Sequence, residues 1–344
     1  MNKSIFKHFE KKNILITGAT GFIGSNLVQI ILDNTKFCNI FATSRNLNKL
    51  EKTFSDKKHL DRLKLRKLNL QTDNFVEDIN LPIHYLFHAA GPQERKIILN
   101  NPLDLVDANI DNLRTYSNFL ISQHKNNGLK GRLIIFSSLT IYGNNFEDKV
   151  INLTEKDSFL ANSLTENMSI YSESKRMSEV LARALNTTYG LDYVTCRIST
   201  IYGQSKNPTE TAFFQFLKDA KSGENINVKE KYGSKRDNLY IKDALIGILS
   251  AAAYGETTET FNISSGGELN NFLSIGEIAL IISNVANEVI HNKELVTVNF
   301  IDEEYKSERG YILDNKKLSS LGWSVKYSYE DAIYEVFKNI RDNL

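Results

Sequence analysis

The residues of this chain best suited to proton transfer are Tyr171 and Lys175, which stand four apart in the stretch IYSESKRMSE. Residues at this spacing lie on one face of a helix, so the phenol and the ammonium would be neighbours. A free phenol has a pKa of about 10, and a nearby cation lowers it by roughly one to three units. The pair therefore predicts a general acid–base, provided that a reactive ligand lies beside it.

A glycine-rich turn near the start of the chain offers such a ligand site. The apolar run NILIT leads into TGATGFIGSNL, in which Gly18, Gly21 and Gly24 follow a G-x-x-G-x-x-G spacing. The first glycine permits a tight turn, the second lets the backbone approach a pyrophosphate, and the third lets the helix pack closely on the strand. The free N–H groups that open this helix attract phosphate. The turn predicts a dinucleotide site, to which we also assign Thr20, Phe22 and Ile23.

The residues after the second expected strand bear on which dinucleotide fits. NAD is gripped there by a carboxylate that bonds the ribose hydroxyls. This strand ends in FATSRNLNK, which has no carboxylate and places Arg45 where a 2′-phosphate would lie. A guanidinium suits a phosphate through paired, charge-assisted contacts, although an arginine at a strand end can also be a solvated charge. The sequence favours NADP and leaves NAD open.

Short apolar runs alternate with helical stretches up to about residue 200. Runs that are apolar on successive residues are typical of strands covered on both faces. Their alternation with helices predicts an α/β fold of the Rossmann type, a doubly wound parallel sheet with a smaller C-terminal lobe. The strands expected are 13–17, 39–43, 63–68, 84–90, 132–138, 192–198 and 261–265. The helices expected are 23–34, 45–58, 103–126, 171–189 and 328–344.

The pattern becomes less regular after about residue 203. A helix is expected over 273–286, opened by Ser274 with Glu277 as its capping-box partner. Ligands of doubly wound sheets bind at the carboxyl ends of the strands, where the strand order reverses. The division expected is a dinucleotide-binding domain of 1–203 plus about 241–260, and a substrate-binding lobe of about 204–240 and 261–344.

Composition argues against several classes of protein. The chain of 344 residues has 42 basic and 41 acidic residues, and this balance does not indicate nucleic acid as a partner. No window approaches the ~20 apolar residues that span a bilayer, and the N-terminal segment lacks the apolar core of a secretory signal. Two cysteines, Cys38 and Cys196, cannot build a disulfide framework or metal site, and their apolar surroundings predict buried thiols. We expect a cytoplasmic protein.

These motifs together resemble the extended short-chain dehydrogenase/reductase family. The branch in question acts on nucleotide sugars and contains epimerases, dehydratases, decarboxylases and ketoreductases. The resemblance covers nearly the whole chain, with the motifs in the family's order. It rests on TGATGFIG, FHAAG, DANIDNLRT, SSLTIYG, YSESK, RISTIYGQ, RDNLYIKDA, FNISSG and LDNKKLSSLGW.

The resemblance implies a catalytic set of Ser138, Tyr171 and Lys175. Tyr171 would exchange a proton with a sugar hydroxyl as hydride moves at the same carbon, and Lys175 would also hold the nicotinamide ribose. Ser138 would hydrogen-bond the reacting oxygen, with Ser137 as its rival for this role. Asn109 would support the site helix or a bound water, or would cap its helix. Further cofactor contacts implied are Asn69, Leu70, Ala89 and Ala90, and His88 would pack near the nicotinamide.

The substrate implied is a nucleoside diphosphate sugar, whose phosphates need positive groups. Arg236 and Arg309 match this need through bidentate contacts, although either can be a surface charge. Thr200 stands where many relatives carry Asn, which puts the usual contact to the sugar phosphate in doubt. Asn69 likewise replaces a common Asp near adenine. Ser138 and Thr140 complete the expected substrate contacts.

Departures from the family pattern narrow the reaction. Dehydratases carry an Asp-Glu pair just after the catalytic hydroxyl residue and decarboxylases a Glu, whereas this chain has Leu139 and Thr140. Both reactions are therefore disfavoured, although YSESKRMSE resembles the decarboxylase branch. A 4-keto-sugar reductase and a 4-epimerase need only hydride and a proton. Arg45 favours the NADPH-dependent reductase, and SLTIYG resembles 4-epimerases of the galactose type.

Two further expectations follow from the resemblance. Some relatives keep the fold as non-catalytic nucleotide-binding subunits, but these usually lack the Tyr-x-x-x-Lys pair, which is intact here. By analogy we expect a homodimer, paired through the helices at 103–126 and 171–189.

Overall fold

The computed structural model shows how the chain arranges these motifs. Asn69 and Leu70, two of the expected cofactor contacts, lie outside the residues that it describes. The described residues are 4–57, 61–68, 79, 81–91, 100–143, 149–157, 164–165, 169–208, 211–290, 294–304 and 309–342.

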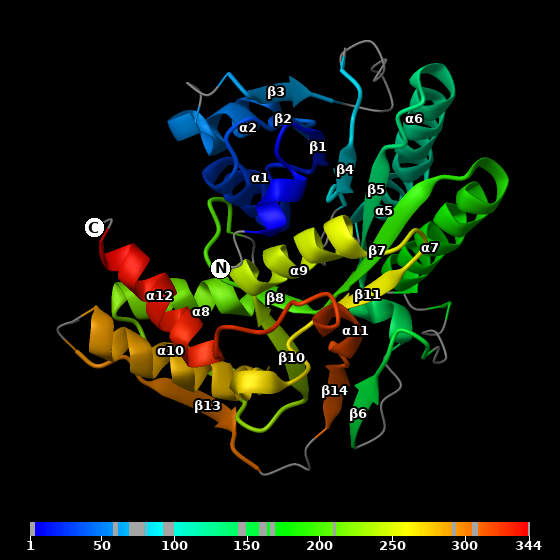
Figure 1. Cartoon of the computed structure of the whole chain (residues 1–344). Coiled ribbons are helices and arrows are strands. Elements are labelled where there is room, and N and C mark those ends of the chain that lie inside the picture. The colour runs from blue at the N-terminus through cyan, green and yellow to red at the C-terminus, as the bar shows by residue number, and fades with distance from the viewer. Residues whose placement is uncertain are drawn as a thin grey trace.

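A parallel sheet of seven described strands runs through the larger part of the molecule, in the order β11-β7-β5-β4-β1-β2-β3 (Figure 1). The chain starts in the middle of the sheet, builds outward to β3, and then returns to build outward on the other side of β1. This confirms the doubly wound α/β fold and puts its switch point between β1 and β4. The strands are β1 (Asn13–Thr17), β2 (Asn39–Ser44), β3 (Leu63–Lys67), β4 (Tyr85–His88), β5 (Arg132–Ser138), β7 (Asp192–Ile198) and β11 (Thr260–Ile263).

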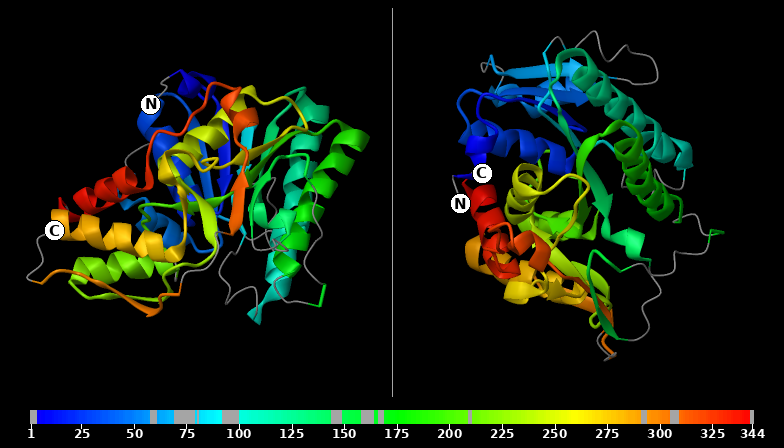
Figure 2. Two further views of the ribbon diagram at one scale, coloured as in Figure 1. Left: turned by 90° about the horizontal axis from the view of Figure 1, so that it is seen from below. Right: turned by 45° about the vertical axis from the view of Figure 1, so that its right-hand side comes forward.

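Helices cover both faces of this sheet (Figures 1 and 2). Side chains alternate along a strand, so Ile134 and Phe136 of β5 join the core under α1 and α9. Leu133 and Ile135 point to the opposite core, under α6 and α7. The covering helices are α1 (Phe22–Asn34), α2 (Leu47–Thr53), α5 (Pro102–Asn109), α6 (Asp111–Asn127), α7 (Ser169–Tyr189) and α9 (Ile241–Tyr254).

Two of the expected helices differ from those in the structure. The helix expected over 103–126 is interrupted at Ile110, whose φ of −111° and ψ of −62° separate α5 from α6. The helix expected over 45–58 ends at Thr53, because Phe54 leaves the helical region with φ −115° and ψ 27°. A separate single turn of 3-10 helix, Ser55–Lys57, follows it.

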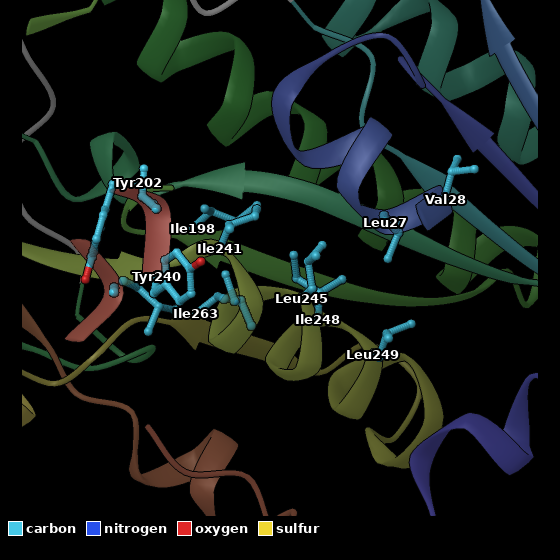
Figure 3. Packing of buried hydrophobic residues seen from close by; sticks show 14 of the residues in the cluster. Leu27, Val28, Ile198, Tyr202, Tyr240, Ile241, Leu245, Ile248, Leu249 and Ile263 are labelled. Carbon is cyan, nitrogen blue, oxygen red and sulfur yellow. The ribbon is translucent and has the colours of Figure 1, made fainter. Parts of the chain in front are cut away.

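The core under α1 and α9 continues into the C-terminal lobe. Figure 3 shows residues of this cluster, with Ile198, Ile263, Tyr202 and Tyr240 near Ile241 at the start of α9, and Leu27 and Val28 of α1 toward its other end. Cys38 and Cys196 are both fully buried, which confirms the expectation for the thiols.

The C-terminal lobe is built around β10, which lies between β12 and β14 and also pairs with β8. The hydroxyl of Ser274 accepts from the backbone N–H of Glu277, and the carboxylate of Glu277 accepts from the backbone N–H of Ser274. The predicted capping box of α10 is thus confirmed. Among the described helices, none has the length and apolar character needed to cross a bilayer. The strands are β6 (Val150–Leu153), β8 (Thr200–Tyr202), β9 (Ile226–Glu230), β10 (Lys235–Tyr240), β12 (Phe272–Leu273), β13 (Val298–Asp302) and β14 (Gly310–Leu313). The helices are α8 (Ala212–Ser222), α10 (Ile275–Val289), α11 (Lys316–Ser319) and α12 (Tyr329–Arg341).

Candidate functional site

A cavity of about 360 Å³ opens at the switch point, beside the carboxyl ends of β1, β2 and β4. Polar backbone and side chains from three strand ends and from α5 and α6 form its walls. Among the residues expected from the sequence, those that line it are Gly18, Thr20, Gly21, Arg45, Ala89 and Ala90. Phe22, Ile23 and Gly24 lie in the first turn of α1, directly behind the glycine turn.

The glycine turn is as tight as its sequence predicts. Gly18 has φ +62°, and a Cβ placed on it would lie 2.7 Å from the carbonyl oxygen of Ala89. A Cβ on Gly24 would lie 2.3 Å from the carbonyl oxygen of Gly18. A larger side chain at either place would push α1 or the loop after β4 away from the turn. Gly21 caps α1, so the N–H groups that open this helix are directed to the cavity edge.

A chain of hydrogen bonds through His88 sets the far wall of the cavity. The ring nitrogens of His88 contact the hydroxyl of Thr17 at 3.2 Å and the carbonyl of Ala108 at 3.0 Å. The backbone N–H of Ala90 donates to the same hydroxyl, at 3.1 Å. Burial lowers the pKa of His88 to about 3, with the charge of Lys175 as a second cause, so the ring is neutral. A ring with so low a pKa is a weak proton acceptor, and its two contacts tie the end of β4 to β1 and α5.

Lys175 projects from α7 to the carboxyl end of β5. Its ammonium is buried and donates to the carbonyl of Phe136 at 2.7 Å. Desolvation lowers the pKa of Lys175 to about 8, and the charge of Glu179 opposes this. A methyl group on Gly91, which lines the cavity, would lie 3.8 Å from the ammonium. The ammonium thus stands immediately behind the cavity wall.

Asn109 lies at the same wall, at the end of α5. Its amide nitrogen donates to Ser174 on α7 at 2.9 Å, so the side chain joins the end of α5 to α7. Its amide oxygen is buried and has no hydrogen-bond partner within the described part of the chain. That oxygen would lie 3.5 Å from a methyl on Gly91. Since buried acceptors are rarely left unpaired, the site fits a ligand that brings a hydroxyl donor, such as a ribose.

Tyr171 and Ser138 lie around Lys175 on the two elements that position it. Tyr171 is buried on α7, one turn before Lys175, and packs with Leu105 of α5. Ser138 ends β5, and its Oγ accepts from the N–H and the hydroxyl of Thr140. Ser137 donates instead to Glu179, at 2.5 Å. The two serines therefore have different surroundings, and Ser137 is engaged in joining β5 to α7.

Arg45 lies at the mouth of the cavity, where its side chain is 73% exposed and stands 3.7 Å from a carboxylate oxygen of Asp104. Several other lining residues were missed by the sequence reasoning. Four of them lie on α5 and α6 at intervals of four residues. This spacing was a usable signal, because it marks one side of a helical stretch despite the break at Ile110. They are Asp104, Ala108, Asn112 and Tyr116, joined by Thr17, Ser44, Asn46 and Lys49 from the strand ends and α2.

Three of the expected substrate contacts lie around β10, in the second sheet. Thr200 pairs in register with Asn238. Arg236 is exposed on β10 itself, and Arg309 immediately precedes the neighbouring β14, where its carbonyl accepts from the N–H of Lys235. Arg236 is thus on β10 and Arg309 just before the adjacent strand, whereas Thr140 follows β5 of the first sheet. No cluster of three or more potential metal ligands occurs among the described residues.

Comparisons with known proteins agree with this architecture. The chain is 25% identical over 338 residues to a trifunctional UDP-glucose 4,6-dehydratase/3,5-epimerase/reductase of Arabidopsis thaliana, covering 94% of the chain and 46% of that protein. The chain thus spans about half the length of this relative. It is 25% identical over 334 residues to dTDP-glucose 4,6-dehydratase 1 of Escherichia coli, covering 93% of the chain and 90% of the relative.

Solved structures share the fold. One is the UDP-N-acetylglucosamine 4-epimerase of Methanobrevibacter ruminantium, with TM-score 0.76, 23% identity and coverage of 97% and 100% of the two chains. Another is a dTDP-glucose 4,6-dehydratase of Streptomyces venezuelae, with TM-score 0.77, 20% identity and coverage of 96% and 97%. The model of the NAD dependent epimerase/dehydratase family matches residues 14–264. The chain belongs to this family, which is part of the extended short-chain dehydrogenases/reductases.

Proposed function

We propose that the chain is an NADPH-dependent reductase of a nucleotide-linked 4-keto sugar. The observation that carries this proposal is the buried ammonium of Lys175, which lies between the wall of the dinucleotide cavity and the strand that ends in Ser138. The two positions after Ser138 hold Leu139 and Thr140, so the carboxylates that elimination of water or carbon dioxide requires are missing there.

Each residue near the cavity has a separate role in the proposed reduction. The bound cofactor would supply the hydride. Lys175 and the amide oxygen of Asn109 bind the hydroxyls of the nicotinamide ribose, and the charge of Lys175 makes the phenol of Tyr171 more acidic. Tyr171 gives its proton to the sugar oxygen as that oxygen gains charge, and Ser138 hydrogen-bonds the same atom.

The choice of NADPH rests on the polar groups that follow β2. Ser44, Arg45, Asn46 and Lys49 line the cavity there, and none of them is acidic. A 2′-phosphate placed among them would compete with Asp104 for the guanidinium of Arg45 and would gain a second cation from Lys49. The ribose hydroxyls of NAD would meet no carboxylate from this strand end.

The substrate diphosphate would be held by the C-terminal lobe. Arg236 is on β10, Arg309 immediately precedes the adjacent β14, and Thr200 is on β8, which also pairs with β10. Two guanidinium groups suit a diphosphate through bidentate contacts. We propose the division into a dinucleotide-binding part, 1–203 with 241–260, and a substrate lobe of 204–240 and 261–344. Two strands of the first range, β6 and β8, pair with strands of the lobe, and β11 completes the sheet of the first part.

A 4-epimerase is the second candidate. Its support is the stretch Ser138–Gly143, whose Ser-x-Thr-aliphatic-Tyr-Gly form resembles 4-epimerases of the galactose type. It uses the same groups as the reductase but returns the hydride to the opposite face of the sugar. Because the cofactor is regenerated in each cycle, an epimerase needs only a catalytic amount.

A homodimer is proposed through α6 and α7. The outer face of α7 exposes Met177 and Val180, at 50% and 59%. Pairing with a second copy would remove these side chains from water. Sedimentation of the wild type and of Val180→Glu tests this, since a dimer should become a monomer in the variant.

One screen separates these activities. The protein is incubated with nucleotide sugars, both native and 4-keto, with NADH and NADPH in separate reactions, and products are identified by mass spectrometry. The reductase consumes one NADPH for each 4-keto sugar reduced. Interconversion of native sugars at trace cofactor would establish the epimerase instead, and loss of water from the substrate would overturn both assignments.

A further inference from the structure

Glu179 joins the helix that carries Tyr171 and Lys175 to the strand that ends in Ser138. Its Oε1 accepts from Ser137 at 2.5 Å and from the Nε of Arg197 at 3.2 Å. Its Oε2 accepts from the Nη2 of Arg197 at 2.9 Å. The side chains of Glu179 and Arg197 are 16% and 12% exposed. One carboxylate thus fastens α7 to both β5 and β7.

Arg197 carries this connection into the turn after Ser138. Its Nη1 donates to the hydroxyl of Tyr142 at 2.9 Å, and its guanidinium lies 5.0 Å from the centre of that ring. Tyr142 in turn donates to Asn262 at 2.7 Å. The turn that begins at Ser138 is therefore anchored through Arg197 to the same carboxylate as the helix.

The charges around Lys175 make Glu179 its main counterion among the described residues. On its own helix, Lys175 has Tyr171 one turn before it and Glu179 one turn after it. From β4 it faces His88, which is neutral, and the carboxylate of Glu179 that acts on it is also paired with Arg197 of β7. β5 offers it the carbonyl of Phe136 and α5 the amide of Asn109, while the two carboxylates of α5, Asp104 and Asp107, line the cavity.

We propose that Glu179 is a positioning residue of this site, which sets α7 against the end of β5 and keeps the ammonium of Lys175 charged while Tyr171 works. A buried cation without a counterion tends to lose its proton. Arg197 weakens the influence of Glu179 on Lys175, because its positive charge partly cancels the negative charge of that carboxylate. This inference rests on the proposed function for its catalytic meaning but is measurable without turnover.

The direct test is the titration of Lys175 by NMR in protein labelled with 13C at lysine Cε. Desolvation lowers the pKa of Lys175 to about 8, so its signal separates from those of exposed lysines and is assigned by its loss in Lys175→Met. In Glu179→Gln the midpoint should fall by roughly one pH unit, because the counterion charge is gone. In Arg197→Gln it should rise, because Glu179 is no longer neutralised. Unmoved midpoints would overturn the proposal.

Asp192→Asn is the matched control. Asp192 forms an ion pair with Arg132 between β5 and β7, at the opposite end of the strands and with similar burial, 13% and 18% exposed. Its loss should lower stability without moving the midpoint of Lys175. If Asp192→Asn shifts that midpoint as far as Glu179→Gln does, the effect is general loosening and the proposal is wrong. If Glu179→Gln does not fold, Glu179→Asp replaces it. The midpoint of Lys175 should then fall less, because the carboxylate is kept but lies farther from the ammonium.

Turnover gives a second readout that separates this inference from the proposed function. With a midpoint moved from about 8 to about 7, Glu179→Gln should lose kcat about eightfold near pH 8.5 and less than twofold near pH 6.5. A uniform loss at both pH values would contradict the electrostatic part. Tyr171→Phe is measured beside it. If Tyr171→Phe remains active, the proposed chemistry fails while the titration still decides the role of Glu179.

Discussion

Strands β5 and β7 have a mostly buried ion pair at each end, and the two pairs have different surroundings. At the amino ends Arg132 pairs with Asp192 at 3.1 Å, and at the carboxyl ends Arg197 pairs with Glu179 at 2.9 Å. All four side chains are mostly buried. Six residue steps separate the ends, which is about 20 Å. The contacts around each pair decide what it can do.

The other hydrogen bonds of the amino-end pair go to the segment at the end of α9 and just after it. Arg132 also donates to the carbonyls of Ala252 and Gly255, and Asp192 accepts from the hydroxyl of Thr257. The carboxyl-end pair instead adjoins Lys175 and the turn at Ser138. Since doubly wound sheets bind ligands at the carboxyl ends, an ion pair is structural at one edge and can tune chemistry at the other.

The largest expected effect is at the carboxyl edge. Tyr171→Phe should lose turnover by at least ~100-fold, the usual scale for a lost general acid–base, while cofactor binding is retained. Steady-state rates and cofactor titration by calorimetry measure both. Tyr85→Phe removes a hydroxyl from β4 at the amino edge and should leave the rate unchanged. Equal losses in the two variants would erase the distinction between the edges.

The ion pair at the amino edge should affect stability and leave turnover unchanged. Asp192→Asn leaves the guanidinium of Arg132 without its counterion, which should cost about 2–3 kcal/mol of unfolding free energy, since two carbonyl acceptors remain. Urea unfolding measures the loss, and turnover per folded molecule should stay constant below the transition. A fall in turnover at full folding would show that this edge also supports catalysis.

A moderate effect is expected at the end of β2. Arg45→Ala should weaken NADPH binding about tenfold and leave NADH binding unchanged, because only the 2′-phosphate meets the guanidinium. Equilibrium binding of both cofactors checks this, with Arg341→Ala on α12 as a control for lost surface charge. Parallel losses for NADPH and NADH would remove Arg45 from the choice of cofactor.

The smallest effect is a divergence between activity and stability with pH. Because burial lowers the pKa of Lys175 to about 8 in the folded state, the unfolded chain binds more protons than the folded one between about pH 8 and 10.5. The contribution of this group to stability therefore rises with pH over that window, while activity that needs the ammonium falls above pH 8. Comparing pH–rate profiles with melting curves of the wild type and Lys175→Met isolates this contribution. A parallel decline attributable to Lys175 would contradict the assignment.

The sheet and its switch point were predictable because their signals are local. The runs at 132–138 and 192–198 became β5 and β7 with the expected bounds, since apolar residues on both faces specify a covered strand. The helix break at Ile110 had no such signal. Neither proline nor glycine stands there, and Asn109 is drawn to Ser174 by tertiary packing.

The site divides in the same way. The glycine turn and the Tyr171–Lys175 pair are short motifs. Spacing alone therefore predicted the turn at the cavity, and the pair on one face of a helix. Glu179 repeats the four-residue step beyond Lys175 and could have been recognised as a third member of that face. Its partner Arg197 comes from another strand, and only the register of β5 with β7 brings it within reach.

Transfer of deuterium from stereospecifically labelled NADPH to a nucleotide 4-keto sugar tests the central claim most directly. The account predicts one deuterium at C4 of the product for each NADPH oxidised, and at least ~100-fold slower transfer in Tyr171→Phe. Product without the label, or equal transfer rates in the two proteins, would contradict it.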